Sequence, residues 1–229
     1  MCGRFQAVDL KGPSNNVTLA ISALAQSLEG TQNLEGTQNL EGTQNLGGFG
    51  VKLKTSGEIF PSDIVPIFTS MIDKSFKAQA ALWGFPVLWP KVGKGGKAKK
   101  PGLLINARSE TASTLPTWRG PLVSGRCLVP SSGYFEWEKR GQIKTKYFFF
   151  LENQPVLLMA GLFQNFPDSP GNWPDRLVII TTKANDYVAD IHQRMPVIIR
   201  SSEAHQWLYG DYQSLFNRQD LAVDRRLAD

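Results

Sequence analysis

The sequence contains only two cysteines and two histidines in 229 residues, and this scarcity excludes several kinds of site. Cys2 and Cys127 have no paired spacing, so we predict neither a zinc site nor a disulfide framework, and we expect no metal and no cofactor. No apolar run approaches the ~18 residues of a membrane span, and no secretory signal opens the chain. We therefore expect a cytoplasmic protein with no membrane partner.

The remaining composition is typical of a globular protein. Hydrophobic residues make up 41% of the chain and aromatic residues 10%, which is enough for a sizeable core. The formal net charge of +5 mildly favours an anionic partner such as nucleic acid. No linker separates two cores, so we predict one domain over residues 1–229. We also expect a monomer, and association with the nucleoid if nucleic acid is the partner and the source is bacterial.

The first residues, Met1-Cys2-Gly3-Arg4, offer unusual chemistry. Removal of Met1 would leave Cys2 at the amino terminus, with an amine and a thiol on adjacent carbons. With an aldehyde this pair closes to a thiazolidine, and with an amide or ester the thiolate attacks while the amine acts as base. Both groups titrate close to neutrality when free, at about 7.7–8.5. The alternative is a cysteine buried as a small apolar residue.

Two segments are predicted to be surface loops. Leu-Glu-Gly-Thr-Gln-Asn occurs three times in tandem from Leu28 to Asn45, and a six-residue unit is far too short for a solenoid repeat. We interpret residues 28–46 as a mobile loop without an assigned function. Residues 91–100 hold five lysines and three glycines after Trp89, so phosphate contacts by the lysines and base stacking by the tryptophan are predicted. A merely solvated loop is the alternative.

Short apolar segments separated by turn residues predict a β-rich fold. Strands are expected at 51–53, 64–68, 80–85, 102–105, 126–130, 133–137, 146–151, 156–163, 176–182 and 197–200. Helices are expected at 14–28, 184–191 and 201–208, the last opening a helical C-terminal tail over about 201–229 and capped by Ser201 or Ser202. The fold class is therefore α+β, dominated by a closed or barrel-like sheet with a few peripheral helices.

Glu136 is a carboxylate in an apolar segment, Gly-Tyr-Phe-Glu-Trp. In a strand it shares a face with Tyr134 and Glu138, while its immediate neighbours point the other way. Burial of that face would raise the pKa of Glu136 into the range of a general acid or base. A solvent-facing glutamate on an amphipathic strand is the alternative.

Two further polar residues lie at the ends of predicted elements. His192 stands between a predicted helix and a strand, which makes it a candidate acid or base, with a structural histidine as the alternative. Asn106 follows three apolar residues, so its amide could donate to an oxyanion or hold the Cys2 amine. Hydrogen bonding to the backbone is the alternative for Asn106. Together these residues supply a nucleophile, a carboxylate, an imidazole and an amide.

Five motifs in this order resemble the SOS response-associated peptidase (SRAP) family. They are Met1–Phe5, Trp83–Phe85, Ile105–Thr111, Gly133–Trp137 and His192–Pro196. The resemblance implies a β-rich fold, self-cleavage that removes Met1, and a thiazolidine crosslink between Cys2 and abasic sites in single-stranded DNA. It also implies a competing lyase outcome, in which the Schiff base alone permits β-elimination and strand cleavage.

The same resemblance assigns roles to individual residues. Cys2 is the nucleophile, Asn106 and Glu136 arrange and deprotonate its amine, and His192 assists sugar ring-opening and crosslink reversal. The DNA contacts that it implies involve Arg4, Trp89, Arg108, Thr181 and Arg194. The sequence departs from the family where Glu58–Asp63 replaces an Arg-Tyr-Asn-x-Ala-Pro stretch found in many members. The six-residue repeat and the lysine-rich loop resemble insertions.

Three other functions are consistent with a Met-Cys-Gly start. An N-terminal-cysteine glutamine amidotransferase typically carries an Asn-His-Arg-Gly-like stretch early in the chain, and the sequence has none. A single-stranded DNA-binding module with an inert Cys2 would form only non-covalent complexes. A peptidase acting on other proteins would need a substrate groove, for which the sequence gives no sign.

Overall fold

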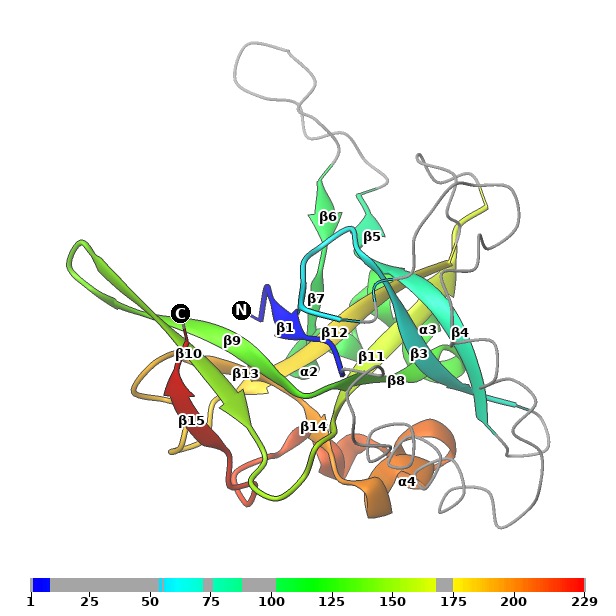
Figure 1. Cartoon of the computed structure of the whole chain (residues 1–229). Helices are drawn as coiled ribbons and strands as arrows, with labels where there is room; N and C mark the ends of the chain where they lie inside the picture. The colour runs from blue at the N-terminus through cyan, green and yellow to red at the C-terminus, as the bar shows by residue number, and fades with distance from the viewer. Residues whose placement is uncertain are drawn as a thin grey trace.

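The computed structural model describes residues 2–8, 54, 56–71, 76–87, 102–167 and 175–228 (Figure 1). The strands are β1 (Phe5–Gln6), β2 (Glu58–Ile59), β3 (Ile64–Ser70), β4 (Phe76–Trp83), β5 (Phe85–Pro86), β6 (Leu103–Leu104), β7 (Asn106–Arg108), β8 (Arg126–Ser131), β9 (Gly133–Arg140), β10 (Ile143–Phe150), β11 (Leu157–Asn165), β12 (Asp175–Lys183), β13 (Arg194–Pro196), β14 (Ile198–Ile199) and β15 (Asp224–Leu227). The helices are α2 (Ser109–Ala112), α3 (Pro116–Ser124) and α4 (Ala204–Tyr209), with 3-10 turns η2 (Ser201–Glu203) and η3 (Gln213–Phe216).

Five strands close into a ring. In order around it, β4 pairs with β3, β3 with β8, β8 with β11, and β11 with β12, all antiparallel. A parallel pairing of β12 with β4, at Arg176↔Leu82, completes the ring. Short strands extend it, with β7 and β13 on β12 and β14 on β11. The β-dominated, closed or barrel-like fold predicted from the sequence is thereby confirmed.

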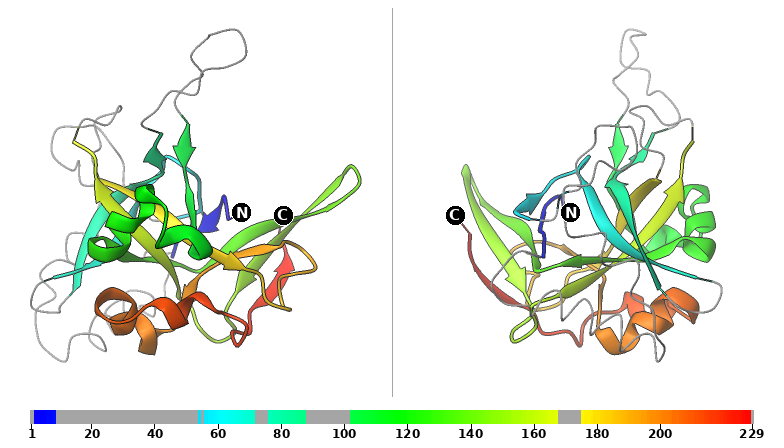
Figure 2. Two further views of the ribbon diagram at one scale, coloured as in Figure 1. Left: turned by 180° about the vertical axis from the view of Figure 1, so that it is seen from behind. Right: turned by 45° about the vertical axis from the view of Figure 1, so that its right-hand side comes forward.

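The ring strands alternate between two apolar clusters, because successive side chains of a strand point to opposite faces. One cluster fills the ring and contains Ile67, Val129, Met159 and Ile179. Their strand neighbours belong to the second cluster, together with apolar residues of helices α3 and α4. The two helices thus cover the outside of the ring, and Figure 2 shows them against its outer surface.

Gly161 permits close packing inside the ring. A methyl group placed there would lie 2.7 Å from Cys127 Sγ and 3.1 Å from Val129 Cγ2. We expect Gly161→Ala to lower the free energy of unfolding by about 1–3 kcal/mol, the usual cost of overpacking a core. Urea unfolding measures this, with Gly120→Ala as control. Gly120 lies in helix α3 with open space around it, so alanine should be neutral or slightly stabilising there. Equal stability of Gly161→Ala and wild type would contradict the packing.

A second sheet holds the amino-terminal segment against a long hairpin. Its strand order is β15-β10-β9-β1-β2, and Phe5 pairs with Tyr134 of β9 on one side and with Ile59 of β2 on the other. The hairpin of β9 and β10 turns at Gly141, whose φ of 61° favours glycine. Figure 1 shows the hairpin projecting from the ring with β15 along its outer edge. The residues after Cys2 are therefore fixed in the middle of a sheet.

The predicted helix at 184–191 is wrong, because this segment forms successive turns. The Asn185 carbonyl accepts from both Val188 and Ala189, and the buried Asn185 amide donates to the carbonyls of Arg218 and Leu221. That side chain anchors the segment to the C-terminal region, so the hydrogen-bond pattern of a helix does not continue.

The helical tail expected over 201–229 is correct only in its first part. Residues 201–209 form η2 and α4, but residues 224–227 form strand β15, which pairs with the free edge of β10. Neither Ser201 nor Ser202 caps the helix; instead the Glu203 carboxylate accepts the Arg200 backbone N–H at 2.9 Å.

Several expectations lie outside the described residues. They are the helix at 14–28, the repeat loop at 28–46, the strand at 51–53, Trp89 and the lysine-rich loop at 91–100. Within the described segments, every helix is too short or too polar to cross a bilayer.

Candidate active site

Cys2 lies in the apolar core, fully buried, with its Sγ 3.8 Å from the Arg4 carbonyl oxygen. It belongs to the cluster that contains Phe5, Trp83 and Tyr134. Burial, assisted by the negative charge of Glu136, raises the pKa of the Cys2 thiol far above its ordinary value. The sulfur is therefore a neutral thiol at neutral pH, and it needs a neighbouring base to become a nucleophile.

Asn106 holds the backbone of Cys2. It opens β7, which pairs in parallel with β12 at Ile179, and its Nδ2 donates to the Cys2 carbonyl oxygen at 2.9 Å. The Asn106 amide therefore hydrogen-bonds to the backbone of Cys2, which is the alternative to a contact with an oxyanion or with the Cys2 amine. Its buried Oδ1 has no hydrogen-bond partner among the described residues, so an acceptor remains available beside the cysteine.

Glu136 occupies β9 opposite Tyr147, and only 3% of its surface is exposed. Tyr134 and Glu138, on the same face, are buried as well, so the buried alternative of the sequence analysis holds. Burial raises the pKa of Glu136, while positive charges including that of His192 act against the rise. A carboxyl group with a raised pKa beside Cys2 has the properties of a general acid or base.

His192 lies beside Glu136, with its Nδ1 3.8 Å from Glu136 Oε1. The ring is oriented by Arg194, whose backbone N–H and carbonyl oxygen lie 3.0 Å and 2.9 Å from Nδ1. The tautomer decides which of the two contacts is the hydrogen bond. About a quarter of the side chain (27%) is exposed, so the imidazole connects the buried carboxylate with solvent.

Two of the predicted DNA-contacting arginines are engaged with carboxylates. Arg194 makes a two-point ion pair with Glu110, at 2.9 Å from Nη2 to Oε2, and donates to the carbonyl oxygen of the buried Thr181 at 2.6 Å. Arg4 donates to Glu58 at 3.0 Å. Arg108 is exposed on β7, in register with Thr181.

The structure thus brings together Cys2, Asn106, Glu136 and His192, which the sequence separates widely. It also adds Tyr134, which we named only as a neighbour of Glu136. Burial, together with the negative charge of Glu136, raises the pKa of its phenol. Within the described residues, no three side chains of the metal-ligating types gather into a metal site.

Comparison with known proteins identifies the class of this chain. The family described as SOS response associated peptidase (SRAP) matches residues 1–224, and the chain belongs to this family.

Its relatives include "Abasic site processing protein YoqW" of Bacillus subtilis (strain 168), which is 38% identical over 159 residues, or 66% of this chain and 68% of the relative. YedK of Escherichia coli (strain K12), with the same description, is 32% identical over 138 residues, or 59% and 57% of the two chains. HMCES of Gallus gallus, also so described, is 31% identical over 164 residues, but the match spans only 48% of that longer protein.

The fold also has solved counterparts. A crystal structure of a protein from Bacteroides thetaiotaomicron superposes with a TM-score of 0.68 at 22% identity, covering 100% of this chain and 92% of that one. At this identity the likeness establishes the fold alone.

Proposed function

We propose that this protein recognises abasic sites in single-stranded DNA and, once Met1 is removed, forms a covalent thiazolidine crosslink through Cys2. The observation that carries the proposal is the placement of Cys2 beside Glu136, a buried carboxyl group whose pKa is raised. Support for the substrate comes from the relatives described as abasic site processing proteins. Self-cleavage after Met1 is part of the proposal, with the Cys2 thiolate as the attacking group.

The proposed reaction uses the aldehyde that a ring-opened abasic sugar presents at C1′. The Cys2 amine adds to C1′ and water leaves, which gives a Schiff base. The thiol sulfur then adds to the same carbon and its proton passes to nitrogen, closing the five-membered ring. The overall change is the loss of one water. Glu136 takes the proton that the ammonium group must lose before it can attack, and His192 delivers a proton to the sugar ring oxygen as the ring opens.

Ring closure competes with strand cleavage in this scheme. A Schiff base acidifies the neighbouring C2′–H, and loss of that proton expels the 3′ phosphate by β-elimination. Attack by the thiol consumes the Schiff base before elimination occurs, so the fixed position of Cys2 favours the intact, crosslinked strand. Lyase activity is the minor outcome that we propose.

The test is to incubate the protein with a single-stranded oligonucleotide that carries one abasic site. We expect a heat-stable band on a denaturing gel, with an intact mass equal to protein lacking Met1 plus DNA minus one water. The same strand with a reduced abasic site, which has no aldehyde, is the control and should give no band. If protein whose mass proves the absence of Met1 yields no adduct, the proposal fails.

Two further assays separate the alternatives. Non-covalent binding alone would give a gel shift only under native conditions. A glutamine amidotransferase would release ammonia from glutamine, and we expect no release.

A further inference from the structure

The face of the second sheet opposite Glu136 carries cations packed over aromatic rings, of which Phe135 and Phe148 are buried. On β9 this face presents Phe135 and Trp137, and on β10 it presents Lys146 and Phe148. Trp137 pairs with Lys146 and Phe135 with Phe148, so the two kinds of side chain meet across the strands. We call this surface the outer face.

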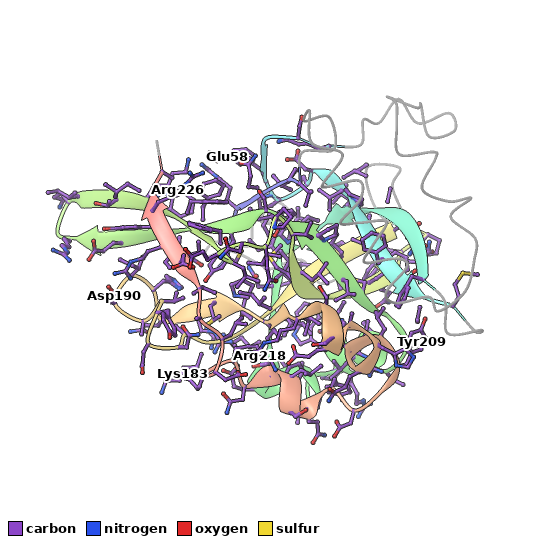
Figure 3. All side chains as sticks on the ribbon, turned by 60° about the horizontal axis from the view of Figure 1, so that its bottom comes forward. Glu58, Lys183, Asp190, Tyr209, Arg218 and Arg226 are labelled. Atoms are coloured by element: carbon purple, nitrogen blue, oxygen red, sulfur yellow. The ribbon has the colours of Figure 1, made fainter. Side chains whose placement is uncertain are left out.

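Three cations on the outer face lie over aromatic rings. The contacts are Arg4 over Phe60 at 4.2 Å and Trp137 at 5.0 Å, Lys146 over Phe135 at 4.6 Å, and Arg226 over Phe148 at 5.3 Å and Phe150 at 5.9 Å. Such contacts hold a long, charged side chain in one place. The row runs across the sheet from the segment before β1 to β15, and Figure 3 shows Glu58 and Arg226 on the same side of the hairpin, away from Arg218.

The Glu58 carboxylate pairs with two of these cations, Arg4 and Lys146. Glu58 Oε1 lies 2.6 Å from Lys146 Nζ, and Oε2 lies 3.0 Å from Arg4 Nη1. Partial burial opposes ionisation, but the hydrogen bonds and charges of Lys146 and Arg4 lower the pKa of Glu58. The group is therefore an anion at neutral pH, with one oxygen on each cation. Two non-bridging oxygens of a phosphodiester could make the same pair of contacts.

We propose that Arg4 and Lys146 form a phosphate-binding site for single-stranded DNA, which the Glu58 carboxylate occupies in the free protein. Arg4 is two residues from Cys2 in the chain, and its pair with Lys146 lies on the face of the sheet opposite Glu136. An incoming phosphate displaces Glu58 from the two cations, and the carboxylate then turns to solvent. Glu58 therefore weakens DNA binding and reduces the number of counterions that binding releases. This inference rests on single-stranded DNA as the partner in the proposed function.

Glu58→Gln tests the competition, because it keeps the shape of the side chain and removes its charge. We expect undamaged single-stranded DNA to bind about tenfold more tightly at low salt, with the slope of log K against log salt steeper by about one. Fluorescence anisotropy of a labelled oligonucleotide with the full-length protein, over a salt series, measures both quantities. Undamaged DNA keeps the covalent step out of the measurement.

A matched control removes one negative charge elsewhere. Asp220→Asn also removes a carboxylate from an arginine, because Asp220 Oδ2 accepts from Arg200 Nη2 at 2.8 Å. Arg200 keeps its second ion pair, with Glu203 Oε1 at 3.0 Å, so this variant changes the charge without exposing a new cation. It raises the net charge by the same amount as Glu58→Gln, and we expect affinity and salt slope to stay close to those of wild type. An equal gain in both variants would attribute the effect to net charge and would overturn the inference.

A second variant tests the cation directly. Lys146→Gln should weaken binding and make the salt slope shallower by about one, since one phosphate contact is lost. Unchanged or weaker binding by Glu58→Gln, or an unchanged slope for Lys146→Gln, overturns the proposed site. Thermal midpoints of both variants show whether the fold is intact. If Glu58→Gln does not fold, the result with Lys146→Gln decides the test.

The two proposals can fail separately. If wild type forms the abasic-site adduct while the Glu58 and Lys146 variants bind like wild type, only the phosphate site is wrong. If the variants behave as expected but wild type forms no adduct, the DNA surface stands and the crosslinking function is wrong. Absence of any binding to single-stranded DNA rejects both.

Discussion

Cys2→Ser should abolish the heat-stable adduct with abasic DNA while strand cleavage persists or increases. Serine keeps the amine that forms the Schiff base, but its hydroxyl is a much weaker nucleophile and does not close a stable ring. The intermediate is then left to β-elimination. Both proteins should be prepared with an amino terminus at residue 2 by cleavage of a removable tag, so that the comparison does not depend on self-processing. The adduct and the cleaved strand are quantified on one denaturing gel.

The matched control is Cys127→Ala, which removes the other cysteine of the chain. Cys127 is buried inside the ring, where burial raises the pKa of its thiol, and no step of the proposed reaction uses it. This variant should keep the adduct. Wild-type levels of adduct in Cys2→Ser would point to another nucleophile and would reject the thiazolidine.

Glu136→Gln should slow adduct formation by about a hundredfold, the usual contribution of a positioned general base. Glutamine has the same shape but accepts no proton from the Cys2 amine. Single-turnover rates measured with excess protein give the effect on the chemical step. Glu138→Gln is the matched control, because Glu138 is a buried glutamate on the same face of the same strand but pairs with Arg140 at 2.6 Å. Equal losses in both variants would contradict a specific role.

The pH dependence of the adduct-formation rate, measured for wild type and Glu136→Gln, gives a further check. Only ionised Glu136 acts as a base, so the wild-type rate should fall as pH drops through a pKa that burial has raised. The rate of Glu136→Gln should not show this fall at low pH.

Stability should respond in the opposite sense. The folded state binds the Glu136 proton more tightly than the unfolded state, so protonation stabilises the fold and this stabilisation is lost as pH rises through the raised pKa. The thermal midpoint of Glu136→Gln should therefore be higher than that of wild type at pH 8. In acid the midpoints of the two proteins should become nearly equal.

The sequence predicted those parts of the fold and site that depend on local pattern. Alternation along Gly133–Trp137 placed Glu136 on one face with Tyr134, and the turn residues separated most ring strands correctly. A buried carboxylate was one of two alternatives, and only the packing of the sheet against the ring decided between them. Asn106 was expected at the end of a strand, but it begins β7, because β12 offers a parallel partner at that position.

Features that depend on distant contacts could not be predicted. The Glu58–Lys146 ion pair joins two strands separated by 88 positions, and neither residue stands out in its own segment. The turns at 184–191 depend on hydrogen bonds from Asn185 to carbonyls more than 30 positions away. Strand β15 is polar and short, and it becomes a strand because the edge of β10 accepts it.

The strand order of the second sheet has a consequence for biosynthesis. Its strands β9 and β10 are flanked by β1, which precedes both in the chain, and by β15, which follows both and ends at Leu227. Joining them requires a loop of most of the chain to close, which is a slow and late event in folding. The support around Cys2 is therefore completed only when synthesis has passed Leu227. Until then a nascent chain carries Cys2 without the complete sheet, so the proposed chemistry cannot begin before β15 has been made.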